Sequence, residues 1–169
     1  MYFEINHQGE NEVYIKVLDD AGKHIGNTMI RCFIYGNRKH LKQKLKHENT
    51  CTRKACLQAA KHIPEPGIIA YVGLLELDYR ERGKGYGPQI LQHIPQLCKK
   101  FQGPTPDVAC AYIWPHFHQL DIETYQHKTL TNQEHRKMRK IMHKAFRRAG
   151  YKQASFLAPQ IVVKRLVKS

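Results

Sequence analysis

A glycine-rich turn behind an apolar run carries the clearest chemical signal in this sequence. Gly83, Gly85 and Gly87 alternate with other residues in a basic stretch, and an amphipathic segment follows at once. Glycine lacks the Cβ atom that obstructs a sharp turn or a close approach to a ligand. The free amides at the start of a helix attract anions. With Arg82 and Lys84 in the same turn, the pattern favours binding of a phosphate or pyrophosphate.

The spacing of the glycines excludes two common kinds of phosphate-binding loop. No Gly-Lys-Ser/Thr closes the stretch, which excludes a P-loop. The third glycine comes one residue too early for a dinucleotide fingerprint, and no ribose-binding acid in a βαβ unit is evident. A glycine turn without any ligand stays open as the plainer interpretation. Residues 82–87 read Arg-x-x-Gly-x-Gly after an apolar strand, and this resembles the acyl-CoA pyrophosphate loop of the GNAT acetyltransferase superfamily.

The elements that must position this loop are predicted from hydrophobic periodicity and turn residues. Asn37 and Thr50 are expected to cap two short helices, and Thr131 or Asn132 a late one that Gly150 ends. The strand over 67–78 is nearly all apolar and is expected to be buried on both faces, whereas 115–130 reads as an irregular loop. The predicted strands cover residues 2–6, 12–18, 25–35, 67–78, 108–114, 153–157 and 161–167, and the helices begin near residues 38, 50, 86 and 131.

The order of these elements extends the resemblance beyond the loop. Over 67–167 the order is strand, glycine loop, helix, strand, helix, strand, strand, which is similar to the GNAT core. The resemblance implies an α/β (α+β) fold with a mixed, mostly antiparallel central sheet, flanking helices and splayed central strands. We expect one domain over 1–169, with 67–167 as the CoA-binding core and 1–66 as an N-terminal hairpin and helical pair. That pair departs from the family, which usually places it before the hairpin.

Carried onto this sequence, the resemblance implies a binding site for acetyl-CoA. The backbone amides of Gly83 to Gly87 would bind the pyrophosphate, and Arg82 and Lys84 would supply positive charge nearby. Main-chain groups of Leu75 and Leu77 would pair with the pantetheine arm like an added strand. The expected cofactor-binding residues are therefore Leu75, Leu77, Arg82, Gly83, Lys84, Gly85, Tyr86 and Gly87.

Three residues are candidates for proton transfer. Glu76 interrupts an apolar strand beside the expected thioester and is the first candidate base, with a salt-bridged strand glutamate as the alternative. His116 is a second candidate, acting through a water, and Tyr125 is a candidate acid; an ordinary loop histidine and a packing tyrosine are the alternatives. Many family members protonate the departing thiolate with a tyrosine four residues before the terminal glycine, where this chain has Phe146. Either another group serves, or the thiolate leaves unaided.

Composition bounds the class of protein. The chain has 169 residues, which suits one domain. Its five cysteines are odd in number and scattered, which argues against a disulfide framework. Four of its His and Cys residues cluster between positions 47 and 62 without Cys-x-x-Cys spacing, so no metal site is expected. The sequence has no apolar stretch long enough to span a bilayer and no evident signal peptide. We therefore expect a cytoplasmic location and no membrane partner.

The charge balance indicates an anionic partner. Twenty-eight Lys and Arg against 14 Asp and Glu give a formal net charge of +14, which favours CoA, RNA or an acidic protein surface as a ligand. Basic stretches at 38–46 and 136–148 are the candidate contact surfaces, with a solvated face as the alternative. The predicted function is acyl-CoA-dependent N-acyltransfer, of acetyl to an amine by direct attack. The alternatives are a catalytically degenerate GNAT-like protein that binds RNA or a protein partner, and an acetyltransferase acting on an RNA-linked amine such as aminoacyl-tRNA.

Overall fold

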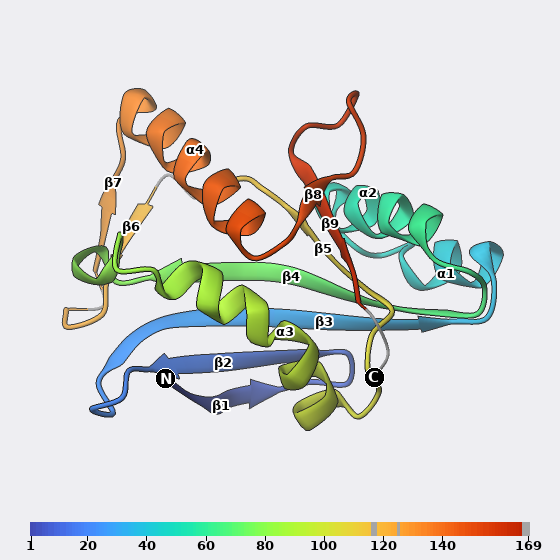
Figure 1. The fold of residues 1–169 in the computed structure, drawn as a ribbon, viewed down its shortest axis with the longest axis horizontal. Helices are drawn as coiled ribbons and strands as arrows, with labels where there is room; N and C mark the ends of the chain where they lie inside the picture. Colours follow the sequence, from blue (N-terminus) through green and yellow to red (C-terminus); the bar gives the residue numbers. More distant parts are fainter. Residues whose placement is uncertain (116–117, 125, 167–169) are drawn as a thin grey trace.

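The computed structural model describes residues 1–115, 118–124 and 126–166. They form a seven-stranded mixed sheet in the order β1-β2-β3-β4-β5-β9-β8, with a small β6-β7 hairpin beside it (Figure 1). The strands are β1 (Tyr2–Gln8), β2 (Glu12–Leu18), β3 (His24–Tyr35), β4 (Gly67–Leu77), β5 (Val108–Tyr112), β6 (His118–Asp121), β7 (Gln126–Thr129), β8 (Lys152–Gln153) and β9 (Ile161–Arg165). The helices are α1 (Arg38–Lys44), α2 (Thr50–Ala59), α3 (Tyr86–Gln102) and α4 (Asn132–Arg148), with single 3-10 turns η1 (Ala60–His62) and η2 (Tyr79–Glu81). Among these described segments, no helix is long and apolar enough to cross a membrane.

Local sequence signals explain where the helices start. The Asn37 side chain accepts from the His40 amide and so caps α1. Thr131 and Glu134 form a capping box at the start of α4. The cap of α2 is Asn49, whose side chain accepts from the Thr52 amide, so the expected cap at Thr50 is wrong by one residue. Asparagine at the earlier position takes the role because its side chain already satisfies a free amide of the first turn.

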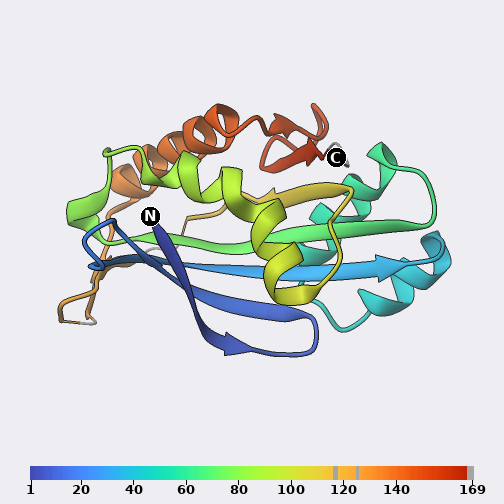
Figure 2. The same ribbon diagram turned by 60° about the horizontal axis from the view of Figure 1, so that its bottom comes forward.

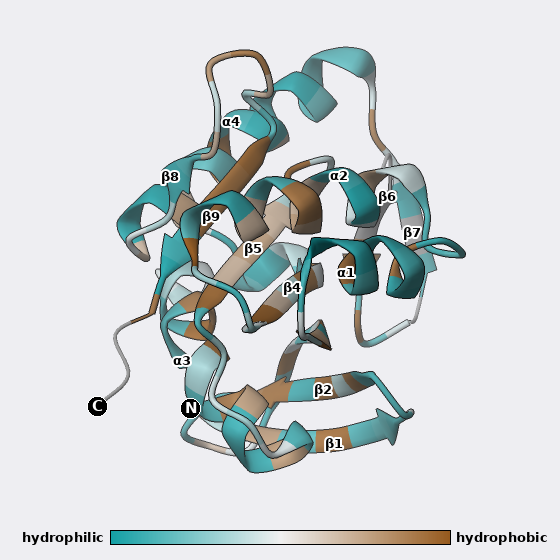
Figure 3. Cartoon of the chain, turned by 90° about the vertical axis from the view of Figure 1, so that its right-hand side faces the viewer, coloured by the Kyte–Doolittle hydropathy of each residue, from teal (hydrophilic) through white to brown (hydrophobic). Residues whose placement is uncertain are grey.

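The helices cover the two faces of the sheet. Helices α3 and α4 pack on one face, where Leu91 of α3 and Phe146 of α4 join a buried core with Val72 of β4. Helices α1 and α2 pack on the other face, around Leu41 and Cys56. Figure 2 shows α3 and α4 together on one side of the sheet, and in Figure 3 the hydrophobic colouring gathers on β5 while α4 is mostly hydrophilic.

Strands β4 and β5 separate in the middle of the sheet. They pair in parallel only from Ile69 to Val72 on β4, although β4 continues to Leu77. On its other side β4 stays paired with β3, with a bulge at Gly73 where the register shifts. An inserted residue changes which side chains face which side. Beyond the bulge, Leu75 packs toward α3 and α4, and the alternation of a strand turns Glu76 to the opposite face.

The expected fold class is confirmed. The sheet is mixed and mostly antiparallel, helices flank it, and its central strands are splayed. Two details differ from expectation. Only the first part of β4 is buried on both faces, because the second part loses β5 as a neighbour. The segment 115–130 contains the β6-β7 hairpin, and β8 has two residues where a five-residue strand was expected. The division at residue 67 into a core and an N-terminal part stays a prediction.

Candidate functional site

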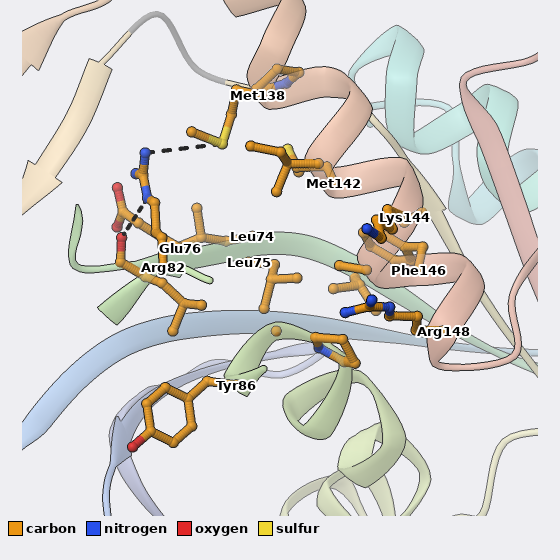
Figure 4. Close-up of a pocket in the computed structure, with 18 of the residues that line it drawn as sticks. Leu74, Leu75, Glu76, Arg82, Tyr86, Met138, Met142, Lys144, Phe146 and Arg148 are labelled. Atoms are coloured by element: carbon orange, nitrogen blue, oxygen red, sulfur yellow. Dashed lines mark hydrogen bonds between the residues drawn. The ribbon is translucent and has the colours of Figure 1, made fainter. Parts of the chain in front are cut away.

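A cavity of about 510 Å³ opens where β4 and β5 separate (Figure 4). Its walls are the second half of β4, the end of β5, the glycine-rich turn and the inner face of α4. The volume falls within the range of small-molecule and cofactor sites. Three α4 side chains, Met138, Ile141 and Met142, line it, and Met142 also packs against the core. Part of the apolar stripe of α4 therefore forms the roof of this cavity, and the rest packs into the core.

The floor of the cavity is the edge of β4 beyond Val72, which pairs with no strand in the described part of the chain. The Leu74 carbonyl accepts from the Thr28 hydroxyl at 2.9 Å, and the Asp78 amide donates to the Ile25 carbonyl at 2.9 Å. Both partners lie on β3. Because main-chain groups alternate along a strand, Leu75 and Leu77 direct theirs to the other edge, where β5 has departed. An extended ligand can pair with this edge in the manner of an added strand.

The glycine-rich turn joins this edge to helix α3. Gly83 and Gly85 have φ of 81° and 88°, in the left-handed region that favours glycine. Helix α3 starts at Tyr86, and Gly85 is its cap residue without a side chain to satisfy the first amides. The amides of Tyr86 and Gly87 belong to the first turn, where no intrahelical carbonyl is available. The turn therefore presents donors and the positive end of a helix to the cavity.

The two cations of the turn are already engaged. The Arg82 Nε donates to the Leu77 carbonyl at 3.3 Å, and its Nη1 lies 3.9 Å from the Met138 sulfur. Burial lowers the pKa of Arg82, while the nearby Glu76 and Asp78 charges raise it. Lys84 instead lies 2.7 Å from the Glu81 carboxylate. Arg82 thus occupies the inner edge of β4, and Lys84 is partly neutralised.

Glu81 and Asp78 hold the turn in place. Lys84 and Lys23 bind opposite oxygens of Glu81 at 2.7 Å and 3.0 Å, and these bonds lower the pKa of that carboxyl. The buried Asp78 accepts from the Arg80 amide and guanidinium, and also from the Ile122 amide at 2.8 Å. The bond from the Arg80 side chain is the main reason that the pKa of Asp78 lies well below its usual range. The glycine-rich turn is therefore anchored both to the sheet and to the β6-β7 hairpin.

Two further cations, Lys144 and Arg148, line the cavity from the last turns of α4. Figure 4 shows them at the opposite end from Arg82 and Glu76. The sequence places both in a longer basic stretch, and nothing in it marks these two. Their i, i+4 spacing puts them on one face of a helix, but only the tertiary contact of α4 with α3 brings that face to the glycine-rich turn.

The predicted site residues are distributed as follows. Leu75, Leu77, Glu76, Arg82, Gly83, Gly85, Tyr86 and Gly87 line the cavity, whereas Lys84 is not among its lining residues. In Figure 4 the Tyr86 ring points away from the other labelled side chains. His116 and Tyr125 lie outside the described residues.

Phe146, where the resemblance in the sequence implies a tyrosine acid in many family members, also lines the cavity. Its ring packs edge to face against Tyr151, with centroids 5.1 Å apart. The Tyr151 hydroxyl is buried without a hydrogen-bond partner among the described residues, and burial raises its pKa far above the usual value. Tyr112, at the end of β5, lines the cavity and accepts a hydrogen bond from Gln160 at 3.0 Å. Its own hydroxyl proton remains able to donate, and no pattern in the sequence marks Tyr112 as a site residue.

The side chains that line the cavity suit an organic anion. Within 1–115, 118–124 and 126–166, no group of three or more His, Cys, Asp or Glu side chains is placed to hold a metal ion. The cavity combines apolar walls, a strand edge with hydrogen-bonding groups, a helix N-terminus, one carboxylate and two rim cations. Such a site can hold an extended ligand with an anionic end and present a carbonyl to the strand edge.

The chain is similar to known proteins in its fold and not in its sequence. No protein-family model matches the chain, and no curated protein sequence matches it. Arylalkylamine N-acetyltransferase 2 from Aedes aegypti is similar at 12% identity and a TM-score of 0.47, over 90% of this chain and 72% of its own. Aminoglycoside acetyltransferase AAC(6')-Ib, solved with coenzyme A and kanamycin, is similar at 12% identity and a TM-score of 0.47, over 92% and 67%. A Drosophila melanogaster polyamine N-acetyltransferase is similar at 10% identity and a TM-score of 0.44, over 90% and 74%.

The fold of this chain is GNAT-like by its own strand arrangement. A parallel pair stands at the centre of an otherwise antiparallel sheet, the pair splays beyond a bulge, and a glycine-rich turn leads from the splayed strand into a helix. The resemblance in the sequence implied the splayed central strands and the glycine-rich turn into a helix, but not the bulge.

Proposed function

We propose that this chain is an acyl-CoA-dependent N-acyltransferase that transfers acetyl from acetyl-CoA to an amine. One observation carries the proposal: the unpaired edge of β4 and the donor-rich turn before α3 line the same cavity. A pyrophosphate fits the turn, because the first amides of α3 have no carbonyl acceptor within the helix. The pantetheine arm, with its amides, fits the edge at Leu75 and Leu77. Engaging the Leu77 carbonyl requires the Arg82 Nε to release it.

The proposed reaction is direct attack of the amine on the thioester. The neutral amine nitrogen forms a bond with the carbonyl carbon, and main-chain donors of the edge stabilise the developing oxyanion. The C–S bond then breaks, and the released thiolate or solvent takes up the second proton that the nitrogen loses. Glu76 takes the proton that the ammonium must lose, because it lies in the cavity beside the splayed edge. Phe146 cannot protonate the departing sulfur. A thiol pKa near 8.5 lets the thiolate leave unaided, and the Tyr112 hydroxyl is the proton donor to test.

Calorimetric titration with acetyl-CoA tests the proposal with a matched pair of variants. Gly85→Asp places a carboxylate in the turn, where it repels a phosphate. Gly103→Asp is its control, because Gly103 ends the same helix and also has a positive φ, of 92°, with open space around its Cβ position. Saturable binding by the native chain and by Gly103→Asp, together with loss in Gly85→Asp, is expected. Absence of binding by the native chain would refute the proposal.

A second candidate function is favoured by the outer surface of α4. Seven cations of this helix are exposed, and none forms an ion pair with a described residue; they are Arg136, Lys137, Arg139, Lys140, Lys144, Arg147 and Arg148. Such a surface suits the phosphate backbone of RNA. Catalytically inactive RNA binding, or acetylation of an RNA-linked amine, would give RNA affinity that falls steeply with salt. Salt-independent or absent RNA binding would exclude both.

A further inference from the structure

Lys144 and Arg148 stand at the contact between α4 and the start of α3. They lie on either side of Ala145 in the sequence, and the Ala145 Cβ is 3.6 Å from the position that a Cβ on Gly87 would take. Gly87 is the last glycine of the glycine-rich turn and belongs to the first turn of α3. Both cations line the cavity and both are exposed at its rim. Two positive charges therefore face solvent beside the donors that would bind a pyrophosphate.

These two cations have no carboxylate partner in the part of the chain that the structure describes. The two cations of the glycine-rich turn already have partners within the chain. Lys84 forms an ion pair with Glu81, and Arg82 donates to the Leu77 carbonyl. The cavity's own carboxylate, Glu76, lies at the opposite end (Figure 4). Positive charge is thus concentrated at one end of the cavity and available to an anion there.

The chemistry of CoA calls for such charge outside the pyrophosphate site. CoA carries a pyrophosphate and, one ribose away, a separate phosphate on the 3′-oxygen. A pyrophosphate bound at the turn sends the pantetheine inward along the edge of β4. The nucleotide then leaves in the outward direction, across the contact of Gly87 with Ala145, where the two rim cations lie.

We propose that Lys144 and Arg148 bind the 3′-phosphate of CoA and thereby make the site selective for CoA thioesters over their 3′-dephospho counterparts. Lysine and arginine are suited to phosphate as charged hydrogen-bond donors. This inference rests on the proposed function, since it needs CoA in the cavity. It assigns residues to the 3′-phosphate, a part of CoA that the glycine-rich turn does not contact in this proposal.

The native chain tests the inference without any substitution. Calorimetry at low salt compares CoA with 3′-dephospho-CoA, which keeps the pyrophosphate and the pantetheine. We expect CoA to bind about tenfold more tightly, as two exposed charged contacts would give. The ratio should shrink as salt is added, because exposed charges are screened. Equal affinities would overturn the inference and leave the proposed function standing, whereas no binding of either ligand would overturn both.

Two double variants assign the selectivity to residues. Lys144→Met/Arg148→Met removes both rim cations, while Lys140→Met/Arg147→Met removes two exposed cations of the same helix that do not line the cavity. Methionine keeps the helix propensity of both pairs. The first variant is expected to bind CoA and 3′-dephospho-CoA equally, and the second to keep the native ratio. A native ratio in the first variant, or a lost ratio in both variants, would overturn the assignment to Lys144 and Arg148.

Discussion

Replacing Gly87 with alanine should change stability and ligand binding in opposite directions. Gly87 lies in the first turn of α3 and is not among the glycines with positive φ. A Cβ there would lie 3.6 Å from the Ala145 Cβ and 4.0 Å from the Leu77 Cδ1, which are ordinary contact distances. The methyl group therefore fits without displacing its neighbours.

The size of the stability effect follows from the backbone. Exchanging glycine for alanine at a compatible site stabilises a protein by roughly 0.4 to 1 kcal/mol, chiefly because the unfolded chain loses freedom. For a chain of this length, that corresponds to a rise in the melting temperature of about 1 to 4 °C. Thermal unfolding followed by circular dichroism measures this rise.

The same methyl group stands in the wall of the cavity, beside the amide that would meet the pyrophosphate. A ligand that needs close approach to the helix start should lose at least about tenfold in affinity, near 1.4 kcal/mol. Titration with acetyl-CoA measures the loss. An unchanged affinity in a stabilised variant would refute the placement of the phosphate at the first turn. A lowered melting temperature would refute the packing derived for Gly87.

Three further predictions concern the strand and its turn. Glu76→Gln should lower kcat by about 10²-fold and leave the affinity for acetyl-CoA unchanged in calorimetry; a fully active variant would remove Glu76 as the base. Gly26→Ala should destabilise by roughly 3 kcal/mol, because its Cβ would lie 2.4 Å from the Glu76 carbonyl oxygen, and a native-like urea midpoint would contradict this contact. Asp78→Asn should cost about 2 to 3 kcal/mol at pH 7, because the amide loses its charged bonds with Arg80. The pKa of Asp78 is lower in the folded chain than in the unfolded chain, so the difference between native and variant should be complete above about pH 5 and shrink below about pH 4. A difference that does not change with pH in urea unfolding would disprove this origin.

Local signals in the sequence were enough for much of the fold. The hairpin of β2 and β3, the cap at Asn37 and the glycine-rich turn into α3 are fixed by residues near one another in the chain. Features that depend on distant partners were not predictable in this way. The half-exposed end of β4 reflects the departure of β5, and the engagement of Lys84 depends on how η2 places Glu81.

The candidate site shows the same division. Leu75, Leu77 and the glycines of the turn follow from a strand-turn-helix pattern, which is local. Lys144 and Arg148 enter the site from a helix nearly sixty residues later, and their part in it depends on the contact of α4 with Gly87. In the sequence, they are indistinguishable from their neighbours Lys140 and Arg147, because all four are cations on an exposed helix.

The splay of β4 from β5 has a thermodynamic consequence. The walls of the cavity that it opens are largely aliphatic, from the leucines of β4 to Met138 and Met142 of α4, and the floor is main chain. An extended ligand that fills this cavity would cover this apolar surface and at the same time pair with the edge of β4. Covering apolar surface lowers the heat capacity, so binding should become more exothermic as temperature rises. A bound ligand would therefore bury the apolar walls of this cavity in the way that a chain segment buries them in a closed core.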